Sequence, residues 1–326
     1  MDITLHDGAV TAVVSTHGAM VTLAVTLPDG HVVEPLFRPA WSPDYDGDPL
    51  LGRVRGDFLC VPFGAEPDSA ALPERWRRLT AGPTAWPHGY AASHEWHPVK
   101  HDTATLVLEL NYPEEDDVAQ VRREVTLTAV GIHIVDTVQA RRVTRQPVGL
   151  HPILRLPSTA GAARLEVSVC RSARTQPIPP EPTSRLAADA VFDCLSAAPL
   201  AAGGTEDVTR LPLQGDREEI ILLDSPEEPR ATLVNEEEGY MVTLRWDDSS
   251  LASLMLWMSN RGRPFAPWDG RNVCLGVEPV SAAFDYGSSI SASDNPLVED
   301  GIPTTIVLSP EVPVVLTHTI EVAPLD

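Results

Sequence analysis

The chain has 326 residues, with 46 acidic and 24 basic side chains and a formal net charge of −22 at pH 7. Nucleic acids and anionic membrane surfaces would repel a chain of this charge, so neither is an expected partner. The four cysteines are widely spaced, unlike the dense disulfide framework of a small secreted domain. No window approaches the roughly 18 consecutive apolar residues of a membrane helix.

The N-terminal sequence MDITLHDGAV contains no basic segment followed by an apolar run, so we expect no secretory signal. Two of the cysteines, Cys60 and Cys274, lie in apolar stretches that are typical of buried free thiols. Together these features predict a cytoplasmic protein.

Strand patterns dominate the chain from end to end. In residues 103–112 (TATLVLELNY), Leu106, Leu108 and Leu110 alternate with other side chains and therefore share one face of a predicted strand. Similar patterns, rich in Val and Thr, predict strands at 9–15, 20–27, 31–33, 121–129, 131–140, 163–169, 219–224, 231–235, 240–246, 253–258 and 273–277, and two more within 304–322.

Helix signals are few, and the clearest is a short helix within 68–79, with Pro73 near its start. The Pro- and Ala-rich stretch 175–205 fits either a linker between two domains or a long loop. We favour a long loop, because the strand character on both sides of it is alike. The sequence therefore predicts an all-β fold in a single domain, 1–326: a large twisted antiparallel β-sandwich with few short helices. One sheet face of such a sandwich can form a groove that holds a sugar.

Three segments carry side chains suited to chemistry. In the first, 86–96 (WPHGYAASHEW), His88 precedes Gly89, and Tyr90 and His94 follow. Flat aromatic faces stack on the C–H surfaces of sugars, and imidazoles bond hydroxyl groups. The alternative is an aromatic loop that only closes the end of the sandwich. We predict neither a metal nor another cofactor, because the histidine spacing matches no metal signature and no cysteine lies nearby.

The other two segments contain His151, in 147–157 (PVGLHPILRLP), and Glu278, in 273–286 (VCLGVEPVSAAFDY). His151 is either a core histidine or one aimed into a cavity, where its ordinary pKa of about 6.5 suits proton transfer. Glu278 follows an apolar strand pattern, where a carboxylate is costly unless it is paired or functional. Burial would raise its pKa toward that of a general base. The alternative is an exposed glutamate at a strand end, since Pro279 would terminate the strand.

The order of these segments resembles that of the aldose 1-epimerase superfamily, which includes galactose mutarotase and the hexose-6-phosphate mutarotases. His88-Gly89-Tyr90-Ala91, followed by Trp96, is similar to that family's HGFAR…W segment. His151-Pro152 resembles its histidine-centred strand, and 275–279 (LGVEP) resembles its CLEP segment. Two flanking stretches also resemble the family. Residues 56–64 (GDFLCVPFG) are similar to its "FP…PFG" stretch, and residues 253–268 are similar to its "vvW…pW" stretch. The resemblance runs from about residue 8 to residue 322.

The resemblance implies a twisted β-supersandwich and a metal-free acid–base mechanism. Glu278 would remove the proton from the anomeric hydroxyl, and His151 would protonate the ring oxygen, so that the hemiacetal opens. Rotation about the C1–C2 bond and reclosure would give the other anomer. The resemblance also implies a sugar contact from His88 and, through a loose alignment of 215–223, one from Asp216. His94 and Trp268 are further candidates for substrate binding.

The sequence departs from the family at two arginine positions. Gly64-Ala65-Glu66 stands where galactose mutarotases carry an Asn-Arg pair, and Ala92 replaces the arginine of HGFAR. A sugar-phosphate substrate would be gripped by arginines, for which the candidates are Arg53, Arg55, Arg77, Arg78 and Arg263. We predict an aldose 1-epimerase-like isomerase that acts on a small-molecule carbohydrate, as a monomer or homodimer. The alternatives are a sugar-phosphate mutarotase and a non-catalytic carbohydrate-binding module on the same fold.

Overall fold

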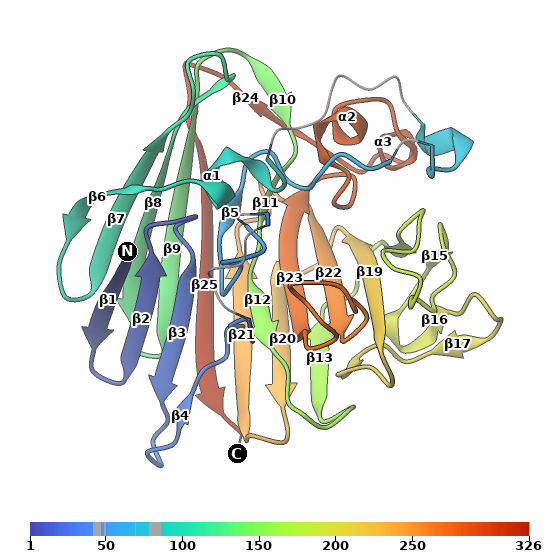
Figure 1. The fold of residues 1–326 in the computed structure, drawn as a ribbon, viewed down its shortest axis with the longest axis horizontal. Helices are drawn as coiled ribbons and strands as arrows, with labels where there is room; N and C mark the ends of the chain where they lie inside the picture. Colours follow the sequence, from blue (N-terminus) through green and yellow to red (C-terminus); the bar gives the residue numbers. More distant parts are fainter. Residues whose placement is uncertain (42–46, 49, 69, 78–85, 326) are drawn as a thin grey trace.

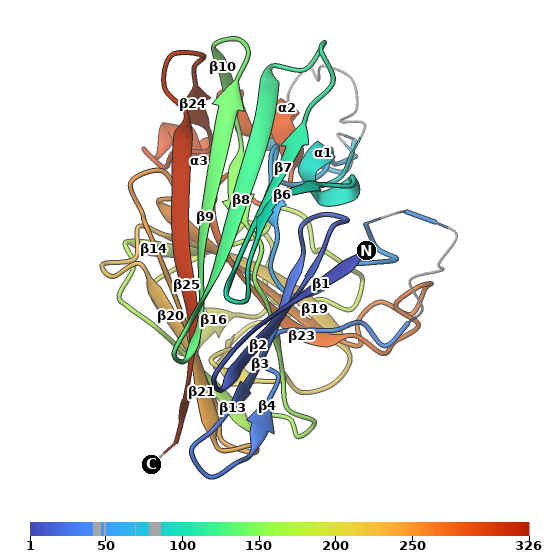
Figure 2. The ribbon, with the colours of Figure 1, turned by 90° about the vertical axis from the view of Figure 1, so that its left-hand side faces the viewer.

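The computed structural model describes residues 1–41, 47–48, 50–68, 70–77 and 86–325 (Figure 1). Two large antiparallel sheets, of nine and eight strands, pack face to face, and a smaller four-stranded sheet extends the second layer (Figure 2). The prediction of a large antiparallel β-sandwich is confirmed.

The nine-stranded sheet forms one complete layer, in the order β18-β13-β20-β21-β25-β9-β8-β7-β6. Its inward side chains are mostly Leu, Ile and Val, and they pack into the main core. Its strands are β6 (His97–His101), β7 (Thr105–Asn111), β8 (Val118–Thr128), β9 (Gly131–Ala140), β13 (Ala163–Val167), β18 (Arg210–Leu211), β20 (Arg230–Asn235), β21 (Tyr240–Trp246) and β25 (Val314–Pro324).

The second layer divides into two sheets. The four-stranded sheet consists of β1 (Asp2–Asp7), β2 (Val10–Ser15), β3 (Val21–Thr26) and β4 (Val32–Val33). The eight-stranded sheet runs β15-β14-β19-β22-β23-β11-β5, with β12 also paired to β23. Its strands are β5 (Leu59–Cys60), β11 (Val148–Leu150), β12 (Ile153–Arg155), β14 (Ser172–Thr175), β15 (Val191–Phe192), β19 (Arg217–Asp224), β22 (Ser253–Asn260) and β23 (Val273–Ser281).

Short elements join these sheets. Two small ribbons pair β10 (Thr144–Gln146) with β24 (Ile306–Leu308), and β16 (Ala198–Pro199) with β17 (Thr205–Glu206). The helices are α1 (Gly89–Ser93), α2 (Gly287–Ser291) and α3 (Pro296–Glu299), with 3₁₀ turns at Glu74–Trp76 and Leu195–Ala197. No helix in the described ranges has the length and apolar character needed to cross a membrane.

The central strands of the eight-stranded sheet are apolar on both faces. In β22, Leu254 and Leu256 point into the main core, while Met255 and Trp257 belong to a second apolar cluster on the opposite face. A strand buried on both sides reads as a continuous apolar run, because neither face meets water. The outer face of this sheet therefore provides a second buried environment, separate from the core of the sandwich.

Most predicted strands agree with the structure to within a few residues, and the differences have physical causes. The expected strand end at Pro279 is wrong: β23 continues to Ser281, because proline removes only its own N–H from the ladder. In the predicted helix of 68–79, the described residues form one 3₁₀ turn, Glu74–Trp76, and residues 69, 78 and 79 lie outside the described ranges. The stretch 175–205 is largely irregular, as expected of a long loop.

Candidate active site

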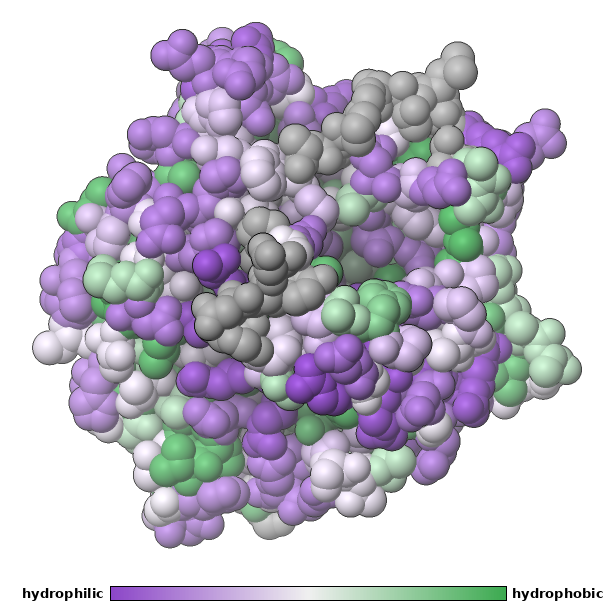
Figure 3. All heavy atoms as spheres, viewed as in Figure 1, coloured by the Kyte–Doolittle hydropathy of each residue, from purple (hydrophilic) through white to green (hydrophobic). Residues whose placement is uncertain are grey.

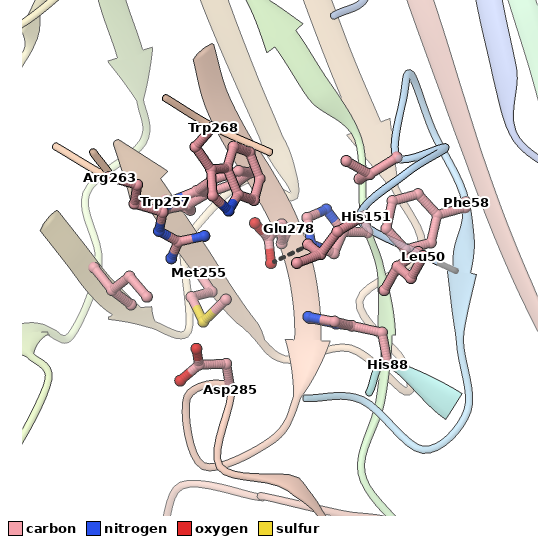
Figure 4. A pocket seen from close by; sticks show the side chains of 13 residues that line it. Leu50, Phe58, His88, His151, Met255, Trp257, Arg263, Trp268, Glu278 and Asp285 are labelled. Carbon is pink, nitrogen blue, oxygen red and sulfur yellow. Dashed lines mark ion pairs between the residues drawn. The ribbon is translucent and has the colours of Figure 1, made fainter. Parts of the chain in front are cut away.

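A cavity opens on the outer face of the eight-stranded sheet (Figure 4). Its empty volume is about 500 Å³, part of which is open to solvent. Four of the six residues that the sequence predicts for the site line it, namely His88, His151, Trp268 and Glu278. Among the described residues, the other walls come from Leu50, Leu51, Val54, Phe58, Ile220, Met255, Trp257, Arg263 and Asp285.

Strand pairing brings His151 and Glu278 together. β11 and β12 pair with the same strand, β23, in one continuous register, and this register places His151 opposite Glu278. The N–H of Val277 donates to the carbonyl of Pro152 at 2.9 Å, so the pairing is kept between the two short strands. Nε2 of His151 lies 3.7 Å from Oε2 of Glu278, as the dashed line in Figure 4 marks.

Both members of this pair are buried, and both have side-chain atoms without a hydrogen-bond partner among the described residues. Neither carboxylate oxygen of Glu278 accepts a hydrogen bond from the described part of the chain. Desolvation, reinforced by the charge of Asp285, raises the pKa of Glu278 well above its ordinary value. Desolvation, reinforced by His88, lowers the pKa of His151 well below its ordinary value.

The distance alone would allow an ion pair between His151 and Glu278. However, the two pKa shifts both favour the uncharged forms, and the described part of the chain offers a carboxylate there no other hydrogen-bond donor. Both shifts therefore favour a carboxylic acid beside a neutral imidazole. The pair then holds one proton that can move between its members.

An aromatic contact fixes the imidazole of His151. The ring of Phe58 stacks on it, with centroids 4.5 Å apart and planes at 18°. The N–H of His151 also donates to the carbonyl of Phe58 at 2.9 Å. Phe58 immediately precedes β5, so the edge of the sheet holds both the backbone and the ring of the histidine.

His88 enters the pocket from the loop before α1. Its backbone is left-handed, with φ 56°, and its N–H donates to the carbonyl of Gly64 at 2.8 Å. The following Gly89 has φ 87°, and a Cβ there would lie 2.1 Å from the carbonyl oxygen of Val61, so only glycine fits. Burial, with a contribution from Arg263, lowers the pKa of His88 to about 4. His88 is therefore a neutral hydrogen-bonding group at pH 7.

Arg263 is the arginine candidate that lines this pocket. Its guanidinium lies over the rings of Trp257 and Trp268, 5.3 Å and 5.0 Å from their centroids. Two carboxylates flank it, Glu181 at 3.2 Å and Glu218 at 3.8 Å. These contacts fix Arg263 as part of the wall and balance much of its charge.

Asp285 is a pocket residue that the sequence analysis did not select. It follows β23 and accepts a hydrogen bond from Nε2 of Gln176. Desolvation raises its pKa. The sequence could have identified Asp285 by its position, because this carboxylate directly follows the apolar run Ala282–Phe284. Glu278 became a candidate by the same argument.

Two predicted binding residues lie outside the pocket lining. Asp216 is exposed, and its Oδ1 accepts a hydrogen bond from Nε of Arg261 at 3.0 Å. The ring of His94 packs on Tyr90 and meets the edge of Trp86, and its Nδ1 lies 2.9 Å from the carbonyl of Tyr90.

Three of the other arginine candidates also lie outside the lining of this pocket. Arg53 and Arg55 line a different surface pocket, and Nε of Arg77 donates to the carbonyl of Leu72. Arg78 lies outside the described residues. Within those residues, no group of three or more His, Cys, Asp or Glu side chains is arranged to hold a metal ion.

No model of a known protein family matches this sequence, and no curated protein sequence matches it. Solved structures do share its fold. A candidate aldose 1-epimerase from Escherichia coli K12 has a TM-score of 0.69 at 17% identity, over 100% of this chain and 99% of that one. An aldose epimerase homologue from C. elegans has a TM-score of 0.67 at 13% identity, with the same coverage of both chains. A galactose mutarotase related enzyme from Lactobacillus acidophilus has a TM-score of 0.63 at 13% identity, again with the same coverage.

The chain therefore has the galactose mutarotase-like fold, from one end of the described structure to the other, as the sequence resemblance predicted. This fold class is an antiparallel β-supersandwich.

Proposed function

We propose that the protein is a mutarotase-like isomerase that interconverts the α and β anomers of an aldose. The observation that carries this proposal is the pairing of His151 with Glu278, 3.7 Å apart in a pocket where neither side chain has a hydrogen-bond partner among the described residues. A buried acid and base without structural partners destabilise the fold, so a functional role best explains why both are present.

In the proposed reaction, the carboxylate of Glu278 accepts the proton of the anomeric hydroxyl, and protonated His151 donates a proton to the ring oxygen. The C1–O5 bond breaks as the C1 carbonyl forms. Rotation about C1–C2 and the reverse transfers close the ring with the opposite configuration. The pair takes one proton and gives one, so its total charge does not change.

This reaction requires the charged arrangement of the pair, whereas burial favours the uncharged one. Sugar hydroxyl groups that enter the pocket would supply the missing donors to Glu278. A carboxylate that accepts such hydrogen bonds has a lower pKa, and its proton would then pass to His151. Neutral His88 would bond a hydroxyl group, and the indole of Trp268 would border the sugar ring.

The test is anomer interconversion, measured by NMR exchange or polarimetry over a panel of free aldoses. We expect acceleration of at least one aldose, and a loss of roughly 10²–10⁴-fold in either Glu278→Gln or His151→Ala. Glu227→Gln, at an exposed position, is the matched control and should keep full activity. Sugar binding without any acceleration would instead support a non-catalytic carbohydrate-binding module.

A further inference from the structure

We infer that the pocket continues into a second lobe that binds the neutral glycosyl unit of a reducing oligosaccharide. The inference rests on the proposed function, because the reducing-end sugar would occupy the pocket of His151 and Glu278. A second cavity shares two lining residues, Arg263 and Asp285, with that pocket. The two cavities are therefore neighbours that share a wall, on a face of the molecule that is visibly hollowed (Figure 3).

The second lobe is large enough for another sugar ring. Its empty volume is about 670 Å³, against about 500 Å³ for the catalytic pocket, and both include space open to solvent. The space in the second lobe that water-sized molecules can occupy is about 300 Å³, at the lower end of the range of about 300–1,000 Å³ that is typical of small-molecule sites. A monosaccharide at the catalytic pair would leave this lobe to water.

The walls of the lobe have the mixed character of a carbohydrate site. Pro179, Pro180 and Tyr286 supply flat apolar surfaces, which suit the C–H faces of a pyranose. Gln176 is only 4% exposed, and its Oε1 has no hydrogen-bond partner, so it can accept a bond from a sugar hydroxyl. Its Nε2 donates to Asp285, which borders both cavities.

The charges of the lobe favour a neutral substituent over a phosphate. Among its described lining residues, Arg263 is the one cation, and Glu66 and Asp285 are acids. Arg263 is already flanked by Glu181 and Glu218 and covered by two indole rings. A phosphate that approached it would also face these carboxyl groups, so its attraction to the guanidinium would be largely offset.

The test compares glucose and galactose with maltose, lactose and glucose 6-phosphate as substrates for anomer interconversion. We expect kcat/KM for at least one disaccharide to exceed that of its reducing-end monosaccharide by about tenfold. Glucose 6-phosphate should be no better than glucose. A preference for the phosphate, or equal rates for all neutral sugars, would overturn the inference and leave the proposed function standing.

A variant that fills the lobe separates the two cavities. Ala65 lines the second lobe only, and its N–H donates to the carbonyl of Asp285, so Ala65→Trp adds bulk there without removing a functional group. We expect a loss of about tenfold or more with disaccharides and less than about twofold with monosaccharides. Ala65→Ser is the matched control, and Pro180→Trp is the second variant if Ala65→Trp does not fold.

Binding gives a readout that does not depend on turnover. Calorimetry with Glu278→Gln should show tighter binding of maltose than of glucose, and Ala65→Trp in that background should remove the difference. If disaccharides bind in this way but no sugar is isomerised, the proposed function fails and the lobe stands. Equal binding of maltose and glucose would overturn the lobe.

Discussion

Gly276 and Glu278 point to the same face of β23, and a methyl group on Gly276 would lie 2.0 Å from Oε1 of Glu278. Side chains two residues apart on a strand are neighbours on one face, so the carboxyl group occupies the space that a larger residue at 276 would fill. The glycine therefore makes room for the proposed catalytic glutamate without contacting the substrate.

We expect Gly276→Ala to reduce activity far more than stability. The methyl group would displace the end of the flexible Glu278 side chain, and a misplacement of about 1 Å can lower a rate by roughly 100-fold. The other close contact, with Cβ of Trp257 at 3.1 Å, requires only a small shift. Anomerisation rates and urea unfolding measured on the same variant provide the test. Full activity, or unfolding at low urea, would contradict the prediction.

Replacing Glu278 with glutamine should stabilise the protein increasingly as the pH rises. Because burial raises the pKa of Glu278, the folded state holds this proton at pH values where the unfolded chain has lost it. Between the unfolded and the folded pKa of Glu278, each pH unit of increase then lowers the free energy of unfolding by about 1.4 kcal/mol. Glutamine does not titrate. We expect urea unfolding at pH 5 and pH 8 to show a growing advantage of Glu278→Gln over the native chain, with Glu227→Gln, at an exposed position, as the control.

The acid limb of the activity profile should lie below the ordinary pKa of histidine. The pair works with one proton, and a second proton on His151 would stop the reaction. Desolvation, reinforced by His88, lowers the pKa of His151, so this loss occurs at lower pH than for an exposed imidazole. The profile of kcat/KM from pH 4 to pH 9 tests this, because it reports the free enzyme. In His88→Gln the limb should move to higher pH, and an unchanged limb would argue against that coupling.

A buried ion network behind the pocket should determine much of the stability. Arg123, which is fully buried, bonds Asp136 through Nε at 2.8 Å and Asp57 through Nη2 at 2.9 Å. Asp57 precedes Phe58, whose ring stacks on His151. Arg123→Met would remove the arginine that pairs with both buried carboxylates, at a cost of about 3–5 kcal/mol.

The neighbouring Arg122 is the matched control for this prediction, since it lies on the opposite, solvent-exposed face of β8. Its ion pairs with Glu109 and Glu124 are only partly buried and reach solvent, so Arg122→Met should cost about 1 kcal/mol or less. Chemical unfolding of both variants measures the difference. Equal losses in the two variants would mean that the buried network contributes no more than a surface pair.

The sequence by itself determined the strand-rich fold, because the alternation of apolar side chains is a local property. It also made candidates of His151 and Glu278, each a titratable residue within an apolar strand pattern, and the family resemblance then implied their roles. It could not separate Asp285 from other carboxylates or Arg263 from other arginines, and it placed Asp216 and His94 at the site although neither lines the pocket. Those assignments depend on which loops meet over the sheet, which no local pattern encodes.

Only the tertiary structure decided the relation between the two proposed catalytic residues. The pairing of β11 and β12 with β23 places His151 opposite Glu278, although the two are far apart in the chain. It also decided their chemistry, because the shifts of both pKa values come from desolvation in a pocket that many segments enclose. Strand register and burial are set by long-range contacts, so they were beyond the reach of any local reading of the chain.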